Sequence, residues 1–474
     1  MIRLIARKEF TEMLRDKRFH WAAGIVLLLL LVALLTGGWH HRGVKRQHDL
    51  AQAETREQWL RQPAKNPHSA AHYGIYAFKP KMLPAMLDRG IDPFVGQSVW
   101  LEAHKQNEFK HRPAQDLTAV QRFGELTAAT VLQLLIPLLI ILLSFSAFVG
   151  EREQGTLRQL LSLGVSRTDL VLGKALGVTG ALGVLLVPAT ILGIAALALT
   201  AEQSLLRSSA PRLLGMFFSY LAYFTLFIGI SLTVSAKAKT SSLSLVILLA
   251  FWILNGLIAP RAVADIARHV YPTPSAFEFQ QILDREMRSG PDGHQTSDQR
   301  TAALKARVLK QYGVETIEAL PVNFAGLSLQ ESEEHGNVVF DRNYGDLWQR
   351  FDQQNRLRQL SALVTPMLAI QSLSMGLAGT DFAHHQDFAA AAEKYRRLLV
   401  KKMNDDLTYQ AVKQSFTYLA PPELWQTVEE FQYTAPSTTW ALQKQALSLA
   451  ILLLWCVLTF AAAIWTARRS LHEA

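Results

Sequence analysis

The sequence predicts an all-α membrane protein with six transmembrane helices, an N-terminal amphipathic interfacial helix and two mainly helical extracytoplasmic domains. Three observations support this prediction. Six apolar runs approach or exceed the roughly 20 residues that a helix needs to cross a bilayer. Half of the 474 residues are hydrophobic while the mean hydropathy is only +0.12, so long polar segments must separate these runs. Lys and Arg gather beside the runs, where they set membrane topology.

The net charge and the cysteine count exclude several other classes of protein. A formal charge of +9 is compatible with nucleic-acid binding, but the basic residues flank apolar runs, so we expect no nucleic-acid partner. The single cysteine, Cys456, rules out an intrachain disulfide and a metal site built from several thiolates.

The chain begins with a predicted basic amphipathic helix at residues 1–18. Its apolar residues recur mostly at spacings of three and four, and six Lys and Arg surround them. We favour a helix on an anionic membrane surface, with lipids as its partner, although packing on the protein itself fits the same pattern.

Residues 19–37 form the first predicted span, because the segment from Ala22 to Leu35 is apolar and uncharged. A signal peptide would share these features, but no small-x-small cleavage site follows, so an uncleaved anchor is favoured. Residues 38–125 are polar and rich in proline, which predicts a first extracytoplasmic domain. Its seven histidines have irregular spacing that matches no metal-ligand motif, so we expect solvated surface side chains at His40, His41, His48, His68, His72, His104 and His111.

Four further spans follow, and a sixth lies near the end of the chain. Pro137 is expected to kink the second span. Gly173, Gly177, Gly180 and Gly183 near the third span permit close helix contact, so another helix is expected there. Residues 201–212 are predicted to be a short external loop. The predicted spans are residues 126–149, 175–200, 213–234, 243–259 and 447–465.

Residues 260–443 are predicted to form a second, mostly helical extracytoplasmic domain. Within it, residues 360–379 are moderately apolar, but a seventh span would place Arg468 and Arg469 outside. We therefore expect a buried or interfacial helix there. Asp381 and Asp387 lie close to two histidines, and a helix N-cap is favoured over a metal site.

Every segment that this scheme places inside is basic, so both termini are predicted to be internal. Residues 1–18 hold six Lys and Arg, and residues 150–174 hold four. Apart from the N-terminal helix, the segment at 150–174 is the only internal segment in this scheme that is long enough to dock a partner.

The chain lacks the motifs of common catalytic sites. No G-x-x-x-x-G-K-[ST], G-x-S-x-G, H-E-x-x-H or paired CxxC occurs, so neither an enzyme nor an ATP cofactor is expected. The cores of the spans contain no charged residue or histidine, which argues against an ion-coupled transporter. Helix-to-helix hydrogen bonds are the expected use of the polar residues in the spans, Gln133, Ser144, Ser146, Thr179, Ser219 and Asn255.

The segment from Phe148 to Lys174, FVGEREQGTLRQLLSLGVSRTDLVLGK, differs from an ordinary connection. Charged residues end the second span, Gly155 and Thr156 indicate a turn and helix start, and leucines follow at amphipathic spacing. A short helix between two spans could receive force from a soluble partner, although a plain charged loop is the simpler interpretation.

The pattern E-R-E-x-G-T-L-R-x-L-L-S-x-G-V-S-R followed by L-x-x-G-K resembles the loop after the second span of ABC-2 type transporter permeases. The placement of two large ectodomains is similar to a bacterial ABC-2 subfamily that carries a domain of unknown function. This resemblance implies a coupling helix that docks on a nucleotide-binding subunit. The implied coupling residues are Glu151, Arg152, Glu153, Gly155, Thr156, Leu157, Leu160 and Arg167.

The resemblance further implies a transmembrane permease subunit in the bacterial inner membrane, acting as an exporter driven by a separate ABC ATPase. Six spans are similar to half of such a transporter, so a second permease copy or paralogue is expected, and the ectodomains could recruit an extracytoplasmic partner. The alternative is a membrane-anchored scaffold or sensor whose ectodomains bind a ligand.

Overall fold

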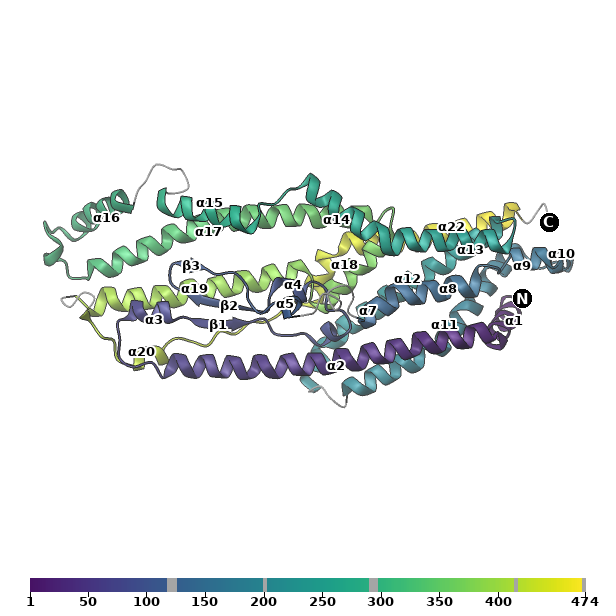
Figure 1. Ribbon diagram of the computed structural model, residues 1–474, viewed down its shortest axis with the longest axis horizontal. Helices are drawn as coiled ribbons and strands as arrows, with labels where there is room; N and C mark the ends of the chain where they lie inside the picture. The colour runs from purple at the N-terminus through teal and green to yellow at the C-terminus, as the bar shows by residue number, and fades with distance from the viewer. Residues whose placement is uncertain (117–125, 199–202, 290–296, 413–416, 471–474) are drawn as a thin grey trace.

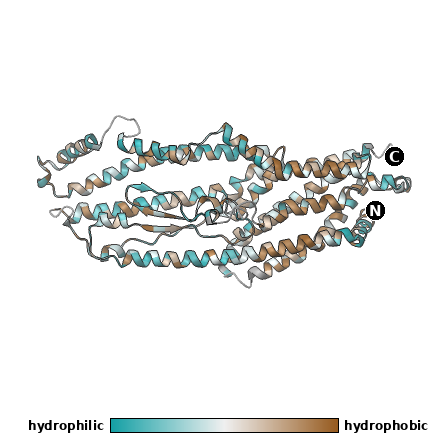
Figure 2. Ribbon diagram, viewed as in Figure 1, coloured by the Kyte–Doolittle hydropathy of each residue, from teal (hydrophilic) through white to brown (hydrophobic). Residues whose placement is uncertain are grey.

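Apolar helices occupy one half of this elongated molecule and polar helices the other half (Figure 2). The computed structural model describes residues 1–116, 126–198, 203–289, 297–412 and 417–470. The N-terminus, the end of α22 (Ala446–Ser470), α1 (Ile2–Arg15) and α10 (Thr156–Ser162) lie at the outer end of the apolar half, here called the terminal end (Figure 1). The other half, here called the polar domain, comes from residues 38–116 and 260–443.

Six helical segments of the described chain are long and apolar enough to cross a membrane. This confirms the predicted class of all-α membrane protein and the number of spans. The predicted boundaries at residues 125 and 200 lie outside the described residues. The six segments are Lys17–Leu60, Ala128–Glu153, Arg167–Ala195, Leu205–Lys237, Ser241–Val270 and Ala446–Arg469.

Helix α1 (Ile2–Arg15) is separated from α2 (Lys17–Leu60) by Asp16, whose carboxylate caps α2 by accepting the Arg18 N–H at 2.8 Å. Helix α2 has 44 residues, so it extends far beyond the predicted span and into the polar domain. Gly37 does not end the helix. It permits close packing instead, because a Cβ there would lie 2.4 Å from the Met86 carbonyl oxygen.

The second span is irregular at Pro137, as predicted. It consists of α7 (Ala128–Thr130), the π-helical turn η2 (Val131–Leu135), α8 (Ile136–Ser144) and α9 (Val149–Glu153). Proline lacks the N–H of a regular helix, and the wider turn before it accommodates this loss.

The remaining apolar helices are longer than predicted. The described part of the expected loop 201–212 is helical and belongs to α12 (Gln203–Lys237). The fifth span continues through a second π-helical turn into the polar domain. The other elements here are α10 (Thr156–Ser162), α11 (Arg167–Ala198), α13 (Ser241–Ile253), η3 (Leu254–Ile258), α14 (Ala259–Val270) and α22 (Ala446–Ser470).

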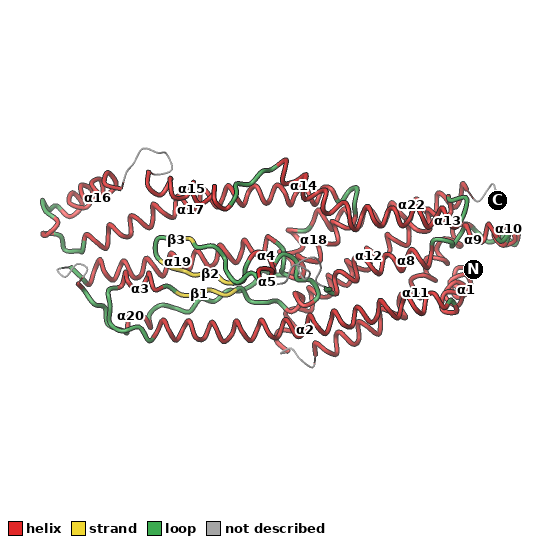
Figure 3. Tube along the Cα trace, viewed as in Figure 1, coloured by secondary structure: helices red, strands yellow, loops and turns green. Residues whose placement is uncertain are grey.

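The first part of the polar domain contains a small antiparallel sheet, which the prediction of a mainly helical domain did not include (Figure 3). The strand order is β1-β2-β3, with Ile75 opposite Leu101 and Glu102 opposite Lys105. The elements are α3 (Pro67–Tyr73), β1 (Ile75–Phe78), η1 (Leu83–Met86), α4 (Asp92–Val95), β2 (Ser98–Glu102), β3 (Lys105–Gln106) and α5 (Pro113–Asp116).

The second part is helical, as predicted. Asp381 caps α19 as expected, since its carboxylate accepts the His384 N–H at 3.1 Å. The elements are α15 (Ala276–Ser289), α16 (Ser297–Tyr312), η4 (Ile317–Ala319), α17 (Phe324–Ser361), α18 (Pro366–Ala378), α19 (Phe382–Gln410), α20 (Glu423–Gln426) and α21 (Thr438–Lys444).

Both parts share one hydrophobic core rather than forming two separate domains. The indole N–H of Trp59 donates to the Trp425 carbonyl oxygen, and the indole N–H of Trp425 donates to the Gln62 carbonyl oxygen, each at 3.0 Å. Both tryptophans are fully buried, so α2 and the chain around α20 are held together at the far end of the molecule.

Helix α18 accounts for the apolar segment at 360–379. Nearly all of its residues are buried, and it packs against α12 and α22 at the boundary between the two halves. Arg212 caps its C-terminal end by donating to the carbonyl oxygens of Gly376 at 3.1 Å and Leu377 at 3.2 Å. The segment is therefore a buried helix, one of the two predicted outcomes.

Asp92 links two buried lysines beneath the sheet, with Oδ1 at 2.7 Å from Lys79 Nζ and Oδ2 at 2.6 Å from Lys81 Nζ. Burial alone would raise the pKa of Asp92, but the two ammonium groups outweigh it and lower the pKa to about 2. Burial is the larger effect at Lys81, whose pKa is lowered. The Asp92 carboxylate is the more strongly stabilised charge, because it has two counter-charges and each lysine has one.

Because the pKa of Asp92 is depressed on folding, its charge stabilises the fold above pH 4 and this stabilisation disappears as the pH falls toward 2. We expect thermal unfolding to show wild type more stable than Asp92→Asn at neutral pH by roughly 2 kcal/mol. This difference should shrink between about pH 4 and pH 2. The exposed Asp49→Asn serves as the control, and a difference that stays constant with pH would contradict the assignment.

The sequence led us to expect that each histidine of residues 38–116 is a separate, solvated side chain. This expectation is wrong for three of them. His68, His72 and His104 lie together, with one ring nitrogen of each within 4.8 Å of the others. Helix α3 places the first two one turn apart, and the turn between β2 and β3 brings the third beside them.

Candidate functional site

The segment that the sequence predicts to contact a partner lies at the terminal end, where α10 projects beyond the other helices (Figure 1). Gly155 separates the two helices with a φ of +74°, a left-handed conformation that favours glycine. The Thr156 hydroxyl donates to the Glu151 carbonyl oxygen at 3.2 Å and closes the turn. The predicted turn and helix start are therefore present.

Glu151 is buried and belongs to a cluster of four charges that joins three helices. Its carboxylate lies 2.9 Å from Lys8 Nζ on α1 and 3.1 Å from Lys174 Nζ on α11. Lys174 in turn contacts Glu9 at 2.7 Å. We call Lys8, Glu9, Glu151 and Lys174 the charge cluster. Burial alone would lower the pKa of Lys8, but its hydrogen bond to Glu151 and the charge of that residue raise it.

The charge cluster depends on close packing between α1 and α11. Ile5, Glu9 and Met13 form the buried face of α1, at a spacing of four residues. They face the glycines of α11, since a Cβ at Gly173 would lie 2.6 Å from Ile5 Cβ. The expected close contact is therefore confirmed for Gly173, Gly177 and Gly180, but not for Gly183, where a Cβ would meet no described atom within 4 Å. The apolar face of α1 packs on the protein itself, which was the alternative to the favoured membrane-surface helix.

Arg152 and Glu153 fasten the same segment to the turn between α12 and α13. The Arg152 guanidinium donates to the carbonyl oxygens of Ala236 and Ala238, both at 2.8 Å. The Glu153 carboxylate accepts the Ser241 N–H at 2.8 Å and the Ser241 hydroxyl at 2.6 Å. These contacts satisfy the end of one helix and the start of the next.

Helix α10 has one buried side and one exposed side. Leu157 is buried and Leu160 is partly buried, whereas Gln159 and Leu163 are exposed, the latter by 77%. Arg167 is partly buried and begins α11. The predicted residues thus divide into an anchored root, Glu151 to Leu157, and an exposed tip around Leu163.

Sequence reasoning did not identify the residues that contact the anchored root, Glu151 to Leu157. Lys8, Glu9 and Lys174 complete the charge cluster, and Ser241, in a distant turn, donates to the Glu153 carboxylate. One signal was present: Glu9 lies on the otherwise apolar face of α1, four residues from both Ile5 and Met13. A charge at such a position needs a buried counter-charge.

A polar chain also crosses from the spans to the polar domain. Gln133 donates to the Tyr220 hydroxyl at 3.0 Å, this hydroxyl lies 2.9 Å from Ser374 Oγ, and Ser374 donates to Asp88 at 2.5 Å. Burial raises the pKa of Asp88. Asn255 makes a second contact between helices by accepting the Met367 N–H at 3.1 Å.

The expected helix-to-helix bonds are thus made by Gln133 and Asn255. Other polar residues of the spans bond within their own helices: Ser144, Thr179 and Ser219 each donate to a carbonyl oxygen four residues earlier.

Six spans, a polar domain at one end and a short projecting helix at the other define a multi-pass membrane protein. Comparison with known families identifies its parts. Residues 103–255 match the family described as ABC-2 family transporter protein, and residues 277–434 match a domain of unknown function, DUF3526. The chain therefore carries an ABC-2 transporter permease domain followed by a DUF3526 domain, which confirms the resemblance seen at Glu151 to Arg167.

A curated relative is similar over part of the chain. It is a probable ABC transporter permease protein NosY from Pseudomonas aeruginosa, 32% identical over 136 residues, which is 28% of this chain and 48% of the relative. The chain thus matches about half of the length of that relative.

Proposed function

We propose that this protein is the transmembrane permease subunit of an ABC transporter, and that a separate ATPase subunit docks on the tip of α10. The permease domain supports the first statement. The observation that carries the second is the division of α10 and its root: Leu163 is 77% exposed, while Glu151, Arg152 and Glu153 hold the adjacent chain to α1, α11 and the α12–α13 turn.

This arrangement suits the transfer of force from a soluble motor to the spans. A displacement of the tip would pass through Arg152 and Glu153 to the fourth and fifth spans, and through Glu151 to α1 and the third span. Because buried charge pairs resist separation, the root would move as one body. Binding energy for the ATPase would come from the exposed tip alone.

The proposed orientation places the terminal end in the cytoplasm, and therefore the polar domain outside the bacterial inner membrane. The basic residues near α1, α10, Lys237 and Arg468 support it. We also propose a second permease copy or paralogue and transport in the export direction. Only 17% of the most apolar stretch of the fifth span is buried within the chain, which leaves apolar surface for lipid or for a second permease.

Leu163→Asp tests the docking site. Leu163 is exposed, so the substitution should leave the thermal stability of the permease unchanged, whereas a new charge at the interface should weaken ATPase binding at least tenfold. The measurement is co-purification of a phosphate-loop ATPase that is expressed together with the permease, followed by a titration of the purified ATPase into permease in lipid nanodiscs. Leu419→Asp, at a leucine of the polar domain that is 61% exposed, is the matched control.

Three outcomes decide between the functions. Loss of ATPase binding for Leu163→Asp alone supports docking at α10. Equal binding by both variants and wild type would place the ATPase elsewhere. If wild type binds no ATPase and remains stable by itself, the membrane-anchored scaffold or sensor is the better description.

A further inference from the structure

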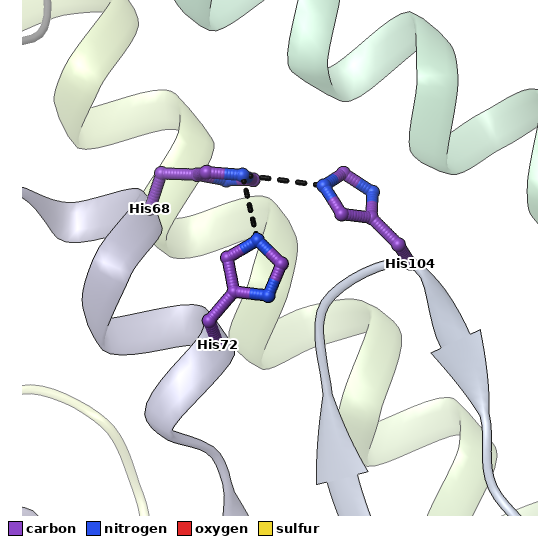
Figure 4. Close-up of side chains that lie close together, drawn as sticks. All are labelled: His68, His72 and His104. Atoms are coloured by element: carbon purple, nitrogen blue, oxygen red, sulfur yellow. Dashed lines mark hydrogen bonds between the residues drawn. The ribbon is translucent and has the colours of Figure 1, made fainter.

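The three clustered histidines point their rings toward a common point in the polar domain, far from α10 (Figure 4). His68 and His72 come from α3, and His104 comes from the turn between β2 and β3. Nε2 of His68 lies 3.2 Å from Nε2 of His72 and 3.2 Å from Nε2 of His104. Three imidazole nitrogens therefore share one small volume.

His104 is held in place by a carboxylate. Glu333 Oε1 lies 2.7 Å from His104 Nδ1 and also accepts the backbone N–H of His104 at 2.7 Å. This backbone has a φ of +64°, which is uncommon for a residue with a side chain. Glu333 is itself buried and lies 3.1 Å from the Arg396 guanidinium. Because Glu333 accepts a hydrogen bond from Nδ1–H, Nε2 is the ring nitrogen of His104 that offers a lone pair to a ligand.

His68 is oriented in the same way. Its Nδ1 lies 3.3 Å from Asn404 Oδ1, and Asn404 uses its amide nitrogen to donate to Gln330. The amide oxygen therefore accepts the Nδ1 proton of His68, and Nε2 of His68 also carries a lone pair. Two lone pairs then face each other at 3.2 Å, an arrangement that is repulsive without a cation between them.

The two 3.2 Å spacings around His68 suit a tetrahedral metal ion, and the third nitrogen pair lies within 4.8 Å. Imidazole nitrogens bind Zn²⁺ at about 2.0–2.1 Å, which places neighbouring ligands roughly 3.3 Å apart. Metal-binding histidines usually donate their other ring N–H to a carboxylate or another oxygen acceptor, as His104 and His68 do here. Nitrogen donors favour late first-row ions over Mg²⁺ or Ca²⁺, which prefer oxygen.

We propose that His68, His72 and His104 bind one divalent transition-metal ion of the Zn²⁺ type, with Glu333 and Asn404 as positioning residues. His72 is exposed, so the fourth coordination position is open to water. The ion would join α3 and the β2–β3 turn, and through Glu333 and Asn404 it would connect them to α17 and α19. Bound metal therefore stabilises the polar domain.

The test is a titration of Zn²⁺ into metal-stripped, full-length protein in detergent, followed by calorimetry and by elemental analysis of stoichiometry. We expect one Zn²⁺ per chain and a rise in Tm on binding. His72→Ala and His104→Ala should each weaken binding about 100-fold or more, and Glu333→Gln about 10-fold to 100-fold. Co²⁺ in place of Zn²⁺ should give the visible absorption of a tetrahedral nitrogen site in wild type but not in His72→Ala or His104→Ala.

His269→Ala is the matched control, because His269 is exposed and lies at the end of α14, outside the cluster. It should bind Zn²⁺ as wild type does. His72→Ala should keep the metal-free Tm of wild type, since that side chain is exposed, so loss of binding there cannot be unfolding. Zn²⁺ binding of unchanged affinity in His72→Ala and His104→Ala, or no Zn²⁺ uptake by folded wild type, would overturn the proposal.

Discussion

Lys174→Met is expected to destabilise the terminal end by about 3–5 kcal/mol, since it leaves buried carboxylates without their main counter-charge. The Lys174 side chain is 1% exposed and contacts both Glu9 and Glu151. Methionine preserves much of the volume but none of the charge, and Lys8 reaches the cluster only from its rim, with 46% of its side chain exposed. Thermal unfolding of the purified permease measures the loss.

A neutral version of the cluster provides the control. Combining Lys174→Met with Glu9→Gln and Glu151→Gln removes the unpaired charges, and we expect it to recover most of the lost stability. The triple variant should still bind the ATPase, because these residues support α10 from inside. If Lys174→Met unfolds at the temperature of wild type, the four charges do not hold the three helices together.

Gly177→Val should displace α1 from α11. A Cβ at Gly177 would lie 2.6 Å from Glu9 Cβ, so valine cannot be accommodated without separating the helices. We expect a loss of about 1–3 kcal/mol from overpacking. Limited proteolysis should also cut faster after Arg7 and Lys8, whose side chains are already exposed, because an α1 displaced from α11 unfolds more readily and presents its backbone to the protease.

Gly183→Val makes the same substitution two turns further along the same helix. A Cβ at Gly183 meets no described atom within 4 Å, so this variant should unfold and be cleaved much as wild type is. If the two substitutions lower the stability equally, the cause is the helix propensity of valine. The contact between α1 and α11 would then be unimportant for stability.

Hydrophobic runs and basic flanks were sufficient to predict the spans, because bilayer thickness and backbone hydrogen bonding restrict what an apolar segment can do. The helix ends were less predictable. The predicted first span stopped at Gly37, yet α2 continues to Leu60, since the packing of Gly37 on Met86 preserves the helix. The sheet was missed because β1 and β2 are short and lie among prolines.

The candidate site was predictable as a segment but not residue by residue. An amphipathic helix has the same pattern whether its apolar face meets lipid or protein, so the packing of α1 on α11 could not be decided from spacing. Glu151, Arg152 and Glu153 follow one another in sequence but contact three different regions. The histidine cluster could not be predicted from sequence spacing either, because His68 and His104 are separated by 36 positions and come together only in the folded chain.

The unbroken length of α2 has a mechanical consequence. Its 44 residues span about 66 Å, roughly twice the hydrocarbon thickness of a bilayer. It is packed near α1 at one end and anchored by Trp59 at the other. Treated as a lever pivoting near Gly37, a tilt of about 10° would swing its distal tip by roughly 6 Å. A rigid helix of this length can therefore transmit a movement of the terminal end across the whole thickness of the membrane, without a chain of side-chain contacts.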